Sequence, residues 1–163
     1  MKLNNNDVLR RLRYSFDYDD PKMIAIFALA GLEVKRGHLV AWLKKEDDPA
    51  YQECNDRMLA TFLNGLISEK RGKRDGPQPK PEMRLNNNLI LLKLKIALNL
   101  KSEDMLDLLR LAGFKLGAAE LSSFFRKPGH RHYRECQDQI LRNLLKGIQL
   151  KYRQATPWDK AKR

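Results

Sequence analysis

The sequence has little cysteine and no long hydrophobic run. Cys54 and Cys136 are its only cysteines, too few for a disulfide framework and typical of a reducing compartment. No apolar run reaches the roughly 18 residues that a membrane-spanning helix needs. The first residues, Met1 to Asn4, lack the apolar centre of a signal peptide. We therefore expect a cytoplasmic protein without membrane association.

Motifs for catalysis and cofactor binding are also missing. There is no Walker motif, no glycine-rich dinucleotide loop and no nucleophile elbow. His132 and Cys136 are four residues apart and would share a helix face, but two ligands do not complete a zinc site. We therefore expect no enzyme, no cofactor and no metal.

What the chain does contain is an internal repeat. Leu3-Asn4-Asn5-Asn6 recurs as Leu85-Asn86-Asn87-Asn88, and the offset of 82 holds without a gap to Arg153, with 20 of 69 positions identical. Such a repeat decides the architecture before any other feature. It divides the chain into a first repeat (3–71), a Pro/Gly-rich linker (72–84), a second repeat (85–153) and a tail (154–163). The alternating prolines favour an extended linker, and we expect the tail to be flexible.

Helical spacing of apolar residues, with no strand pattern, predicts an all-α fold of two tandem four-helix repeats. We expect Asn5 or Asn6 to cap the first helix. Asp20-Pro21 would open the second helix, and Gly31 would end it in a left-handed conformation. The third helix would run from residue 36 to about 44, or from 118 to about 126 in the second repeat. The fourth would begin after Asp48-Pro49 and carry Tyr51 and Cys54 on its apolar stripe.

The second and third helices of each repeat form a corner that resembles a helix-turn-helix. In that interpretation an exposed side of the third helix would read DNA, and the side chains concerned in the first repeat are Lys35, Arg36, His38, Ala41 and Lys45. The alternative is a plain helical corner, which many bundles contain.

Charge separates the two repeats. The whole chain has a net charge of +12; the first repeat is neutral, with 11 basic and 11 acidic residues, and the second carries 13 basic against 6 acidic residues. This asymmetry predicts an anionic partner for the second repeat.

The densest basic stretch is residues 126–134, and its counterpart, residues 44–52, is charge-balanced. Its cations and imidazoles suit phosphate contacts, and the residues concerned are Arg126, Lys127, His130, Arg131, His132 and Arg134. Both imidazoles would add charge in mildly acidic solution and tighten such contacts. The alternative is a solvated loop with Tyr133 in the core.

The first helix of the second repeat is apolar nearly all round. Asp7, Arg10 and Tyr14 of the first repeat are replaced there by Leu89, Leu92 and Ile96. We expect these three side chains to be buried against the other repeat or a second molecule.

Two further features recur in both repeats. The asparagine triplets exceed what capping needs, so the extra amides either bond to neighbouring segments or contact phosphates and bases. The carboxylate pairs Glu53/Asp56 and Glu135/Asp138 are expected to complement a helix dipole or to pair with basic residues of the first helices rather than to catalyse.

Together these motifs resemble the YehS-like family of small bacterial cytoplasmic proteins, which carry a duplicated domain of unknown function. The resemblance rests on both Leu-Asn-Asn-Asn starts, on Phe-Ala-Leu-Ala-Gly at 27–31, on residues 41–47 and on residues 126–131. It covers the repeat region, departs from Ala155 onward, and implies no mechanism.

The sequence therefore predicts a non-enzymatic nucleic-acid-binding or regulatory protein whose phosphate contacts come mainly from the second repeat. Either DNA or RNA fits this interpretation. The alternative is a protein-interaction module that docks an acidic protein partner. A monomer and a homodimer are both compatible with the pattern.

Overall fold

A computed structural model describes residues 2–153 of the chain, and these residues form eight α-helices and no strand. The all-α prediction is confirmed. The first repeat contains α1 (Asn5–Ser15), α2 (Asp20–Leu29), α3 (Arg36–Leu43) and α4 (Asp56–Arg71). The second contains α5 (Asn87–Ala97), α6 (Ser102–Leu111), α7 (Ala118–Ser123) and α8 (Asp138–Tyr152). The expected tail, residues 154–163, lies outside the described residues.

The first asparagine of each triplet caps the first helix. The Asn4 side chain accepts a hydrogen bond from the Asp7 N–H (2.8 Å), and the Asp7 carboxylate accepts one from the Asn4 N–H (3.3 Å). Asn86 accepts from the Leu89 N–H at 2.8 Å in the same way. The prediction that Asn5 or Asn6 caps α1 is wrong by one or two positions, because those amides serve other partners.

The second helices begin one residue earlier than expected and end as expected. Asp19 caps α2 by accepting from the Lys22 N–H, so Asp20 is already helical. Gly31 and Gly113 have φ values of +84° and +80°, the left-handed conformation that glycine adopts without steric cost. This ending turns the chain sharply into the segment that leads to α3 or α7.

The fourth helices begin later than expected, at Asp56 and Asp138. The third asparagine explains the delay. Asn6 accepts a hydrogen bond from the Cys54 N–H (3.0 Å) and donates to the carbonyls of Trp42 and Gln52 (both 2.9 Å). Backbone groups bound in this way are not available to a helical ladder, so Tyr51 and Cys54 lie in the connection that precedes α4.

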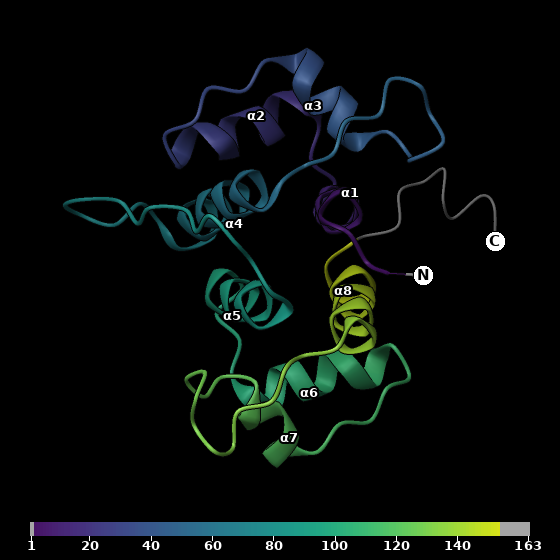
Figure 1. Cartoon of the computed structure of the whole chain (residues 1–163), viewed down its shortest axis with the longest axis vertical. Coiled ribbons are helices and arrows are strands. Elements are labelled where there is room, and N and C mark those ends of the chain that lie inside the picture. The colour runs from purple at the N-terminus through teal and green to yellow at the C-terminus, as the bar shows by residue number, and fades with distance from the viewer. Residues whose placement is uncertain (1, 154–163) are drawn as a thin grey trace.

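The two repeats pack on each other through the first and fourth helix of each repeat. In Figure 1 the first repeat lies above the second, and α1 packs against α8 while α4 packs against α5. Within the repeats, α2 lies on α4 and α6 lies on α8 at close range. A Cβ at Gly65 or Gly147 would lie 2.0 Å from a carbonyl oxygen of the facing helix, Ile26 or Leu108. Only glycine permits this approach.

Asp56 and Asp138 join the repeats through matching hydrogen bonds. Asn5 Nδ2 donates to Asp56 Oδ1 (2.8 Å), and the Leu85 N–H of the other repeat donates to Asp56 Oδ2 (2.9 Å). The same pair of bonds occurs at Asp138, from Asn87 Nδ2 (2.8 Å) and from the Leu3 N–H (3.0 Å). Each aspartate is also the first residue of its helix, where a negative charge is favourable. The carboxylates of Asp56 and Asp138 therefore have a structural role at the contact between the repeats.

The amide of Asn87 is the main reason that the pKa of the Asp138 carboxyl lies below its ordinary value. Burial opposes this effect, and the Leu3 N–H adds to it. Both bonds favour the charged carboxylate.

The predicted burial of Leu89, Leu92 and Ile96 against the other repeat is wrong for Leu92 and Ile96, and their burial against a second molecule stays a prediction. Leu89 is half-buried, while Leu92 and Ile96 are 37% and 45% exposed. The opposite face of α5 packs on α4 and includes Lys93, whose ammonium donates to Asn64 Oδ1 (2.6 Å) and pairs with Glu82 (3.0 Å). The same buried face carries Ile90, Leu91 and Leu94, so the side of α5 with Leu92 and Ile96 faces outward.

Residues 72–84 connect the repeats as a loop that projects from the left of the molecule in Figure 1. The linker does not separate the repeats, since α4 and α5 pack directly on each other. Cys54 and Cys136 are buried core residues, as expected, and burial raises the pKa of each thiol to about 12.

Candidate nucleic-acid interface

The basic loop, residues 126–134, connects α7 to the segment before α8 and lies on the surface. The side chains expected to contact phosphate are all exposed, and they are Arg126, Lys127, His130, Arg131, His132 and Arg134. The structure therefore brings these six residues together in one short loop, as the sequence predicted. Tyr133 is half-buried beneath them.

The basic loop is held at its base by the third asparagine of the second triplet. Asn88 Nδ2 donates to the carbonyls at both ends of the loop, Phe124 (3.1 Å) and Arg134 (2.8 Å), and Asn88 Oδ1 accepts from the Cys136 N–H (2.9 Å). The Arg134 N–H adds a bond to the Ser123 carbonyl at 3.3 Å. These bonds confirm the structural interpretation of the extra asparagines. They also fix where the loop leaves and rejoins the core.

The charged groups of the basic loop bond only to the loop itself within the described part of the chain. Arg131 Nε donates to His132 Nε2 (3.1 Å), the His132 N–H donates to His130 Nδ1 (3.0 Å), and Arg134 donates to the Tyr133 carbonyl (2.8 Å). Among residues 2–153, no carboxylate forms an ion pair with any of these side chains. Their positive charge is therefore available to an external anion.

In the matching loop of the first repeat, two acidic side chains accept hydrogen bonds from groups of the same repeat. Glu46 accepts a hydrogen bond from the Asn4 side chain, and Asp48 accepts one from the Ala50 N–H at 2.8 Å. Arg10 pairs with Asp7 and donates to the Lys44 carbonyl at 2.7 Å. The same backbone position thus carries an internally bonded loop with three acids against two lysines in one repeat and a cationic loop in the other.

Two hollows flank the basic loop. The first, the cationic hollow, has a volume of about 350 Å³ and is lined by Ala119, Glu120, Ser122, Ser123, Arg126, His132 and Arg134. The Ser123 hydroxyl already donates to the Glu120 carbonyl (2.5 Å). Hydroxyl, imidazole and guanidinium groups donate hydrogen bonds to phosphate oxygens. The two guanidinium groups outnumber the one carboxylate, so the hollow suits an anion such as phosphate.

The second hollow, the apolar groove, lies between α5 and the basic loop and has a volume of about 290 Å³. Leu89 and Leu92 form one wall, Phe125 and Tyr133 contribute rings, and Lys127 stands at the rim. Lys95 covers the Phe125 ring, with its ammonium 5.0 Å from the ring centre.

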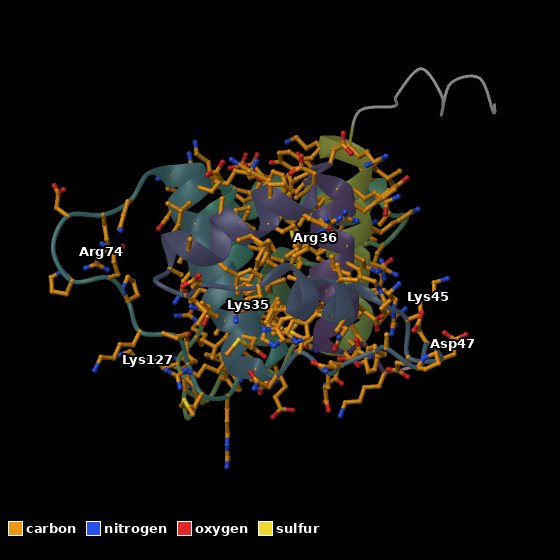
Figure 2. All side chains as sticks on the ribbon, turned by 90° about the horizontal axis from the view of Figure 1, so that it is seen from above. Lys35, Arg36, Lys45, Asp47, Arg74 and Lys127 are labelled. Atoms are coloured by element: carbon orange, nitrogen blue, oxygen red, sulfur yellow. The ribbon has the colours of Figure 1, made fainter. Side chains whose placement is uncertain are left out.

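The residues of the first repeat that were predicted to read DNA lie far from the basic loop. Lys127 and Lys45 lie at opposite edges of the molecule in Figure 2, with Lys35 and Arg36 near the centre of that view. Arg36 pairs with Asp20 at 3.3 Å. The first and second repeats therefore do not form one continuous cationic surface from these residues.

The exposed side of α3 also differs from the DNA-reading side that the sequence predicted. Ala41 is buried, so its placement on an exposed side is wrong. His38 remains exposed, and its ring centre lies 6.3 Å from that of Trp42. The helix leaves Lys35 and Arg36 at its start, and DNA docking at this corner stays a prediction.

A further hollow lies elsewhere, between the first repeat and the end of the second. It has a volume of about 640 Å³ and is lined by Arg10, Arg13 and Tyr14 of the first repeat and Arg153 of the second, among others. Its arginines already have acidic partners: Asp7 for Arg10, Asp20 for Arg13 and Asp17 for Arg153. Volume alone therefore does not make it the better anion site.

Four residues of the site were not recognised in the sequence, namely Ser122, Ser123, Leu89 and Leu92. The leucines were visible as departures from Asp7 and Arg10 in the repeat comparison, but they were assigned to an interface with the other repeat or a second molecule. No signal in the sequence distinguished the two serines from an ordinary helix end.

Over residues 2–153 there is no group of three or more His, Cys, Asp and Glu residues that could hold a metal ion. No helix within that range is long and apolar enough to cross a membrane.

Comparison with known proteins matches the internal repeat. The family described as "Protein of unknown function (DUF1456)" matches twice, over residues 5–72 and 87–154, with the same offset of 82. The chain is 42% identical over 145 residues to "Uncharacterized protein YehS" of Escherichia coli (strain K12), covering 88% of this chain and 93% of that protein. No solved structure matches.

Proposed function

The chain belongs to the DUF1456 family in both of its repeats, and for this member we propose a non-enzymatic role in binding nucleic acid through the basic loop of the second repeat. The observation that carries the proposal is the contrast between two equivalent loops on one scaffold. The acids of one loop outnumber its lysines and two of them bond to groups of the first repeat, whereas the other loop exposes cations without carboxylate partners among the described residues.

Phosphate binding suits this arrangement better than a general surface charge does. The basic loop is anchored at both ends by Asn88, so its cations start from a defined place on the fold. Ser122, Arg126, His132 and Arg134 line one hollow, where the two arginines outnumber the carboxylate of Glu120. Side chains that donate from several directions can surround one phosphate, whereas scattered lysines only screen charge.

Both imidazoles accept a hydrogen bond in the free loop, through His130 Nδ1 and His132 Nε2. Where one ring nitrogen accepts, the other carries the N–H and can donate to a phosphate oxygen.

The test measures the dependence of binding on salt concentration. Fluorescence anisotropy with labelled single-stranded and duplex oligonucleotides would compare the wild type with a variant in which Arg126, Lys127, Arg131 and Arg134 are alanine. Removing one phosphate contact lowers the salt slope by about 0.7 for single strands or about 0.9 for duplex DNA. We expect the slope to fall in this variant.

The matched control removes four exposed cations of the first repeat, namely Lys35, Arg36, Lys45 and Arg57, by substitution with alanine. We expect its salt slope to stay close to that of the wild type. An unchanged slope in the loop variant would remove the basic loop from the mechanism. A lack of binding by the wild type at low salt would reject the proposed function as a whole.

An acidic protein partner is the second candidate, because Leu92 and Ile96 of α5 are exposed beside the basic loop. Acidic partners with apolar anchors use such surfaces. Absorbance at 260 nm in protein purified without nuclease separates the two candidates: co-purifying nucleic acid favours the first, and clean protein that retains an acidic polypeptide favours the second.

A further inference from the structure

The apolar groove of the second repeat lies where hydrogen bonds connect the matching segments of the first repeat. In the first repeat Arg10 spans the same place, since its guanidinium pairs with Asp7 and donates to the Lys44 carbonyl. The Tyr51 hydroxyl there donates to Asn6 Oδ1 at 3.0 Å. These bonds tie α1 to the loop that follows α3 and close the gap between them.

The second repeat lacks each of these closing bonds. Leu89 and Leu92 replace Asp7 and Arg10, and neither can bond to the backbone of the basic loop through its side chain. The Tyr133 hydroxyl donates to no group of the part of the chain that the structure describes, in contrast to Tyr51. The gap stays open as the apolar groove, with Tyr133 on one side and Leu92 on the other.

We propose that the apolar groove holds an unpaired base of a single-stranded nucleic acid whose phosphates lie on the basic loop. This inference rests on the proposed function and adds the strand state that the site selects. A base that is paired in a duplex cannot turn into the groove without breaking its pairing, whereas a base of a single strand is free to enter.

The dimensions of the groove favour a base over a protein segment. Its volume of about 290 Å³ is near the lower limit of about 300–1,000 Å³ for small-molecule sites. A docked amphipathic helix needs anchor positions over two turns of its length, and Ile96, one turn beyond Leu92, lies outside the groove lining. One planar ring fits this lining, with Tyr133 and Phe125 as stacking partners.

The charge at the rim selects the same occupant. Arg126 and Lys127 line the groove, and the other cations of the basic loop follow in the same segment of the chain. A phosphate attached to the bound base meets these groups directly. A second copy of the chain, with its net charge of +12, would bring like charge to this rim.

The experiment combines removal of the base with removal of the apolar wall. Anisotropy titrations would use a labelled single-stranded oligonucleotide, an abasic strand of the same length and charge, and a duplex. The proteins are the full chain, Leu92→Gln and Ile96→Gln. Both substituted side chains are exposed on the same helix, so both variants are expected to fold, and Ile96→Gln is the matched control outside the groove.

The wild type is expected to bind the single strand roughly 5- to 100-fold more tightly than the abasic strand, the range for stacking of one base. Leu92→Gln should remove most of this preference without changing the salt slope, and Ile96→Gln should retain it. Equal affinity for the base-bearing and abasic strands, with the salt slope still dependent on the basic loop, would overturn the base site and leave the proposed function intact.

The other outcomes also decide the proposal. Preference for the duplex over the single strand would overturn it. Tight binding of a leucine- and glutamate-rich helical peptide, abolished by Leu92→Gln, would also overturn it if neither the base-bearing nor the abasic strand binds. In that case the proposed function fails as well, and an acidic protein is the occupant.

Discussion

Replacing Asn88 by alanine should destabilise the second repeat far more than its position in a polar triplet suggests. The Asn88 side chain is 7% exposed and makes three hydrogen bonds, to the carbonyls of Phe124 and Arg134 and from the N–H of Cys136. Alanine would leave the buried Cys136 N–H without a partner, at a cost of about 1–3 kcal/mol. Each carbonyl would also forgo a bond with a net value of about 0.5–1.5 kcal/mol.

The expected loss in free energy of unfolding is therefore about 2–6 kcal/mol, a large part of the roughly 5–15 kcal/mol that stabilises a typical domain. Urea denaturation followed by circular dichroism would measure it. Asn86→Ala is the matched control, because Asn86 only caps α5 and should cost about 1 kcal/mol. Equal losses in the two variants would refute the role of Asn88 in holding the base of the basic loop. Faster hydrogen exchange at the Cys136 amide should accompany the larger loss.

Close helix packing, a paired carboxylate and two buried thiols each allow a further test. Gly65→Ala and Gly147→Ala should each destabilise the protein by about 1–3 kcal/mol or more, since the new Cβ would meet a carbonyl oxygen at 2.0 Å. Gly37→Ala is the control: with open space around it, this substitution should stabilise α3 by up to about 1 kcal/mol. Equal thermal unfolding of the three variants would contradict the close helix contact. The lowered pKa of Asp138 means that its contribution is present above the unfolded-state value of about 3.9 and is lost as pH falls through the folded value. The stability gap between the wild type and Asp138→Asn should therefore shrink between neutral pH and about pH 3, and a gap independent of pH would contradict this. Cys54 and Cys136, whose thiol pKa values burial raises to about 12, should react with a thiol reagent slowly in the native protein and rapidly in guanidinium chloride; fast reaction of the native protein would place them outside the core.

The sequence predicted the architecture because duplication makes every local signal appear twice. The helix ends at Gly31 and Gly113 and the matched core cysteines were clear from either repeat. The starts of the fourth helices were not. Their apolar spacing extends back to Tyr51, but the Asn6 side chain binds the backbone there, and a contact between residues 48 positions apart leaves no trace in local periodicity.

The candidate site was predictable in its charges and not in its shape. The four cations and two imidazoles of the basic loop could be identified from the sequence because exposed side chains of this kind need only to lie close together in the chain. The helix α5 is apolar on more than one side, and the structure buries the side with Ile90, Leu91 and Leu94, together with Lys93 bound to Asn64. Leu92 lies on the other apolar side and lines the groove. Hydrophobicity alone does not say which apolar side of such a helix is buried, so the apolar part of the site could not be deduced from it.

Binding of nucleic acid by the second repeat can be tested in growing cells by ultraviolet crosslinking of the full chain, followed by mapping of the crosslinked peptides by mass spectrometry. We expect crosslinks within residues 124–134, with Tyr133 as a favoured position because it lies in the apolar groove. We also expect the crosslinked fragments to be single-stranded. Crosslinks confined to the first repeat, or protein recovered without any attached nucleic acid, would contradict both proposals.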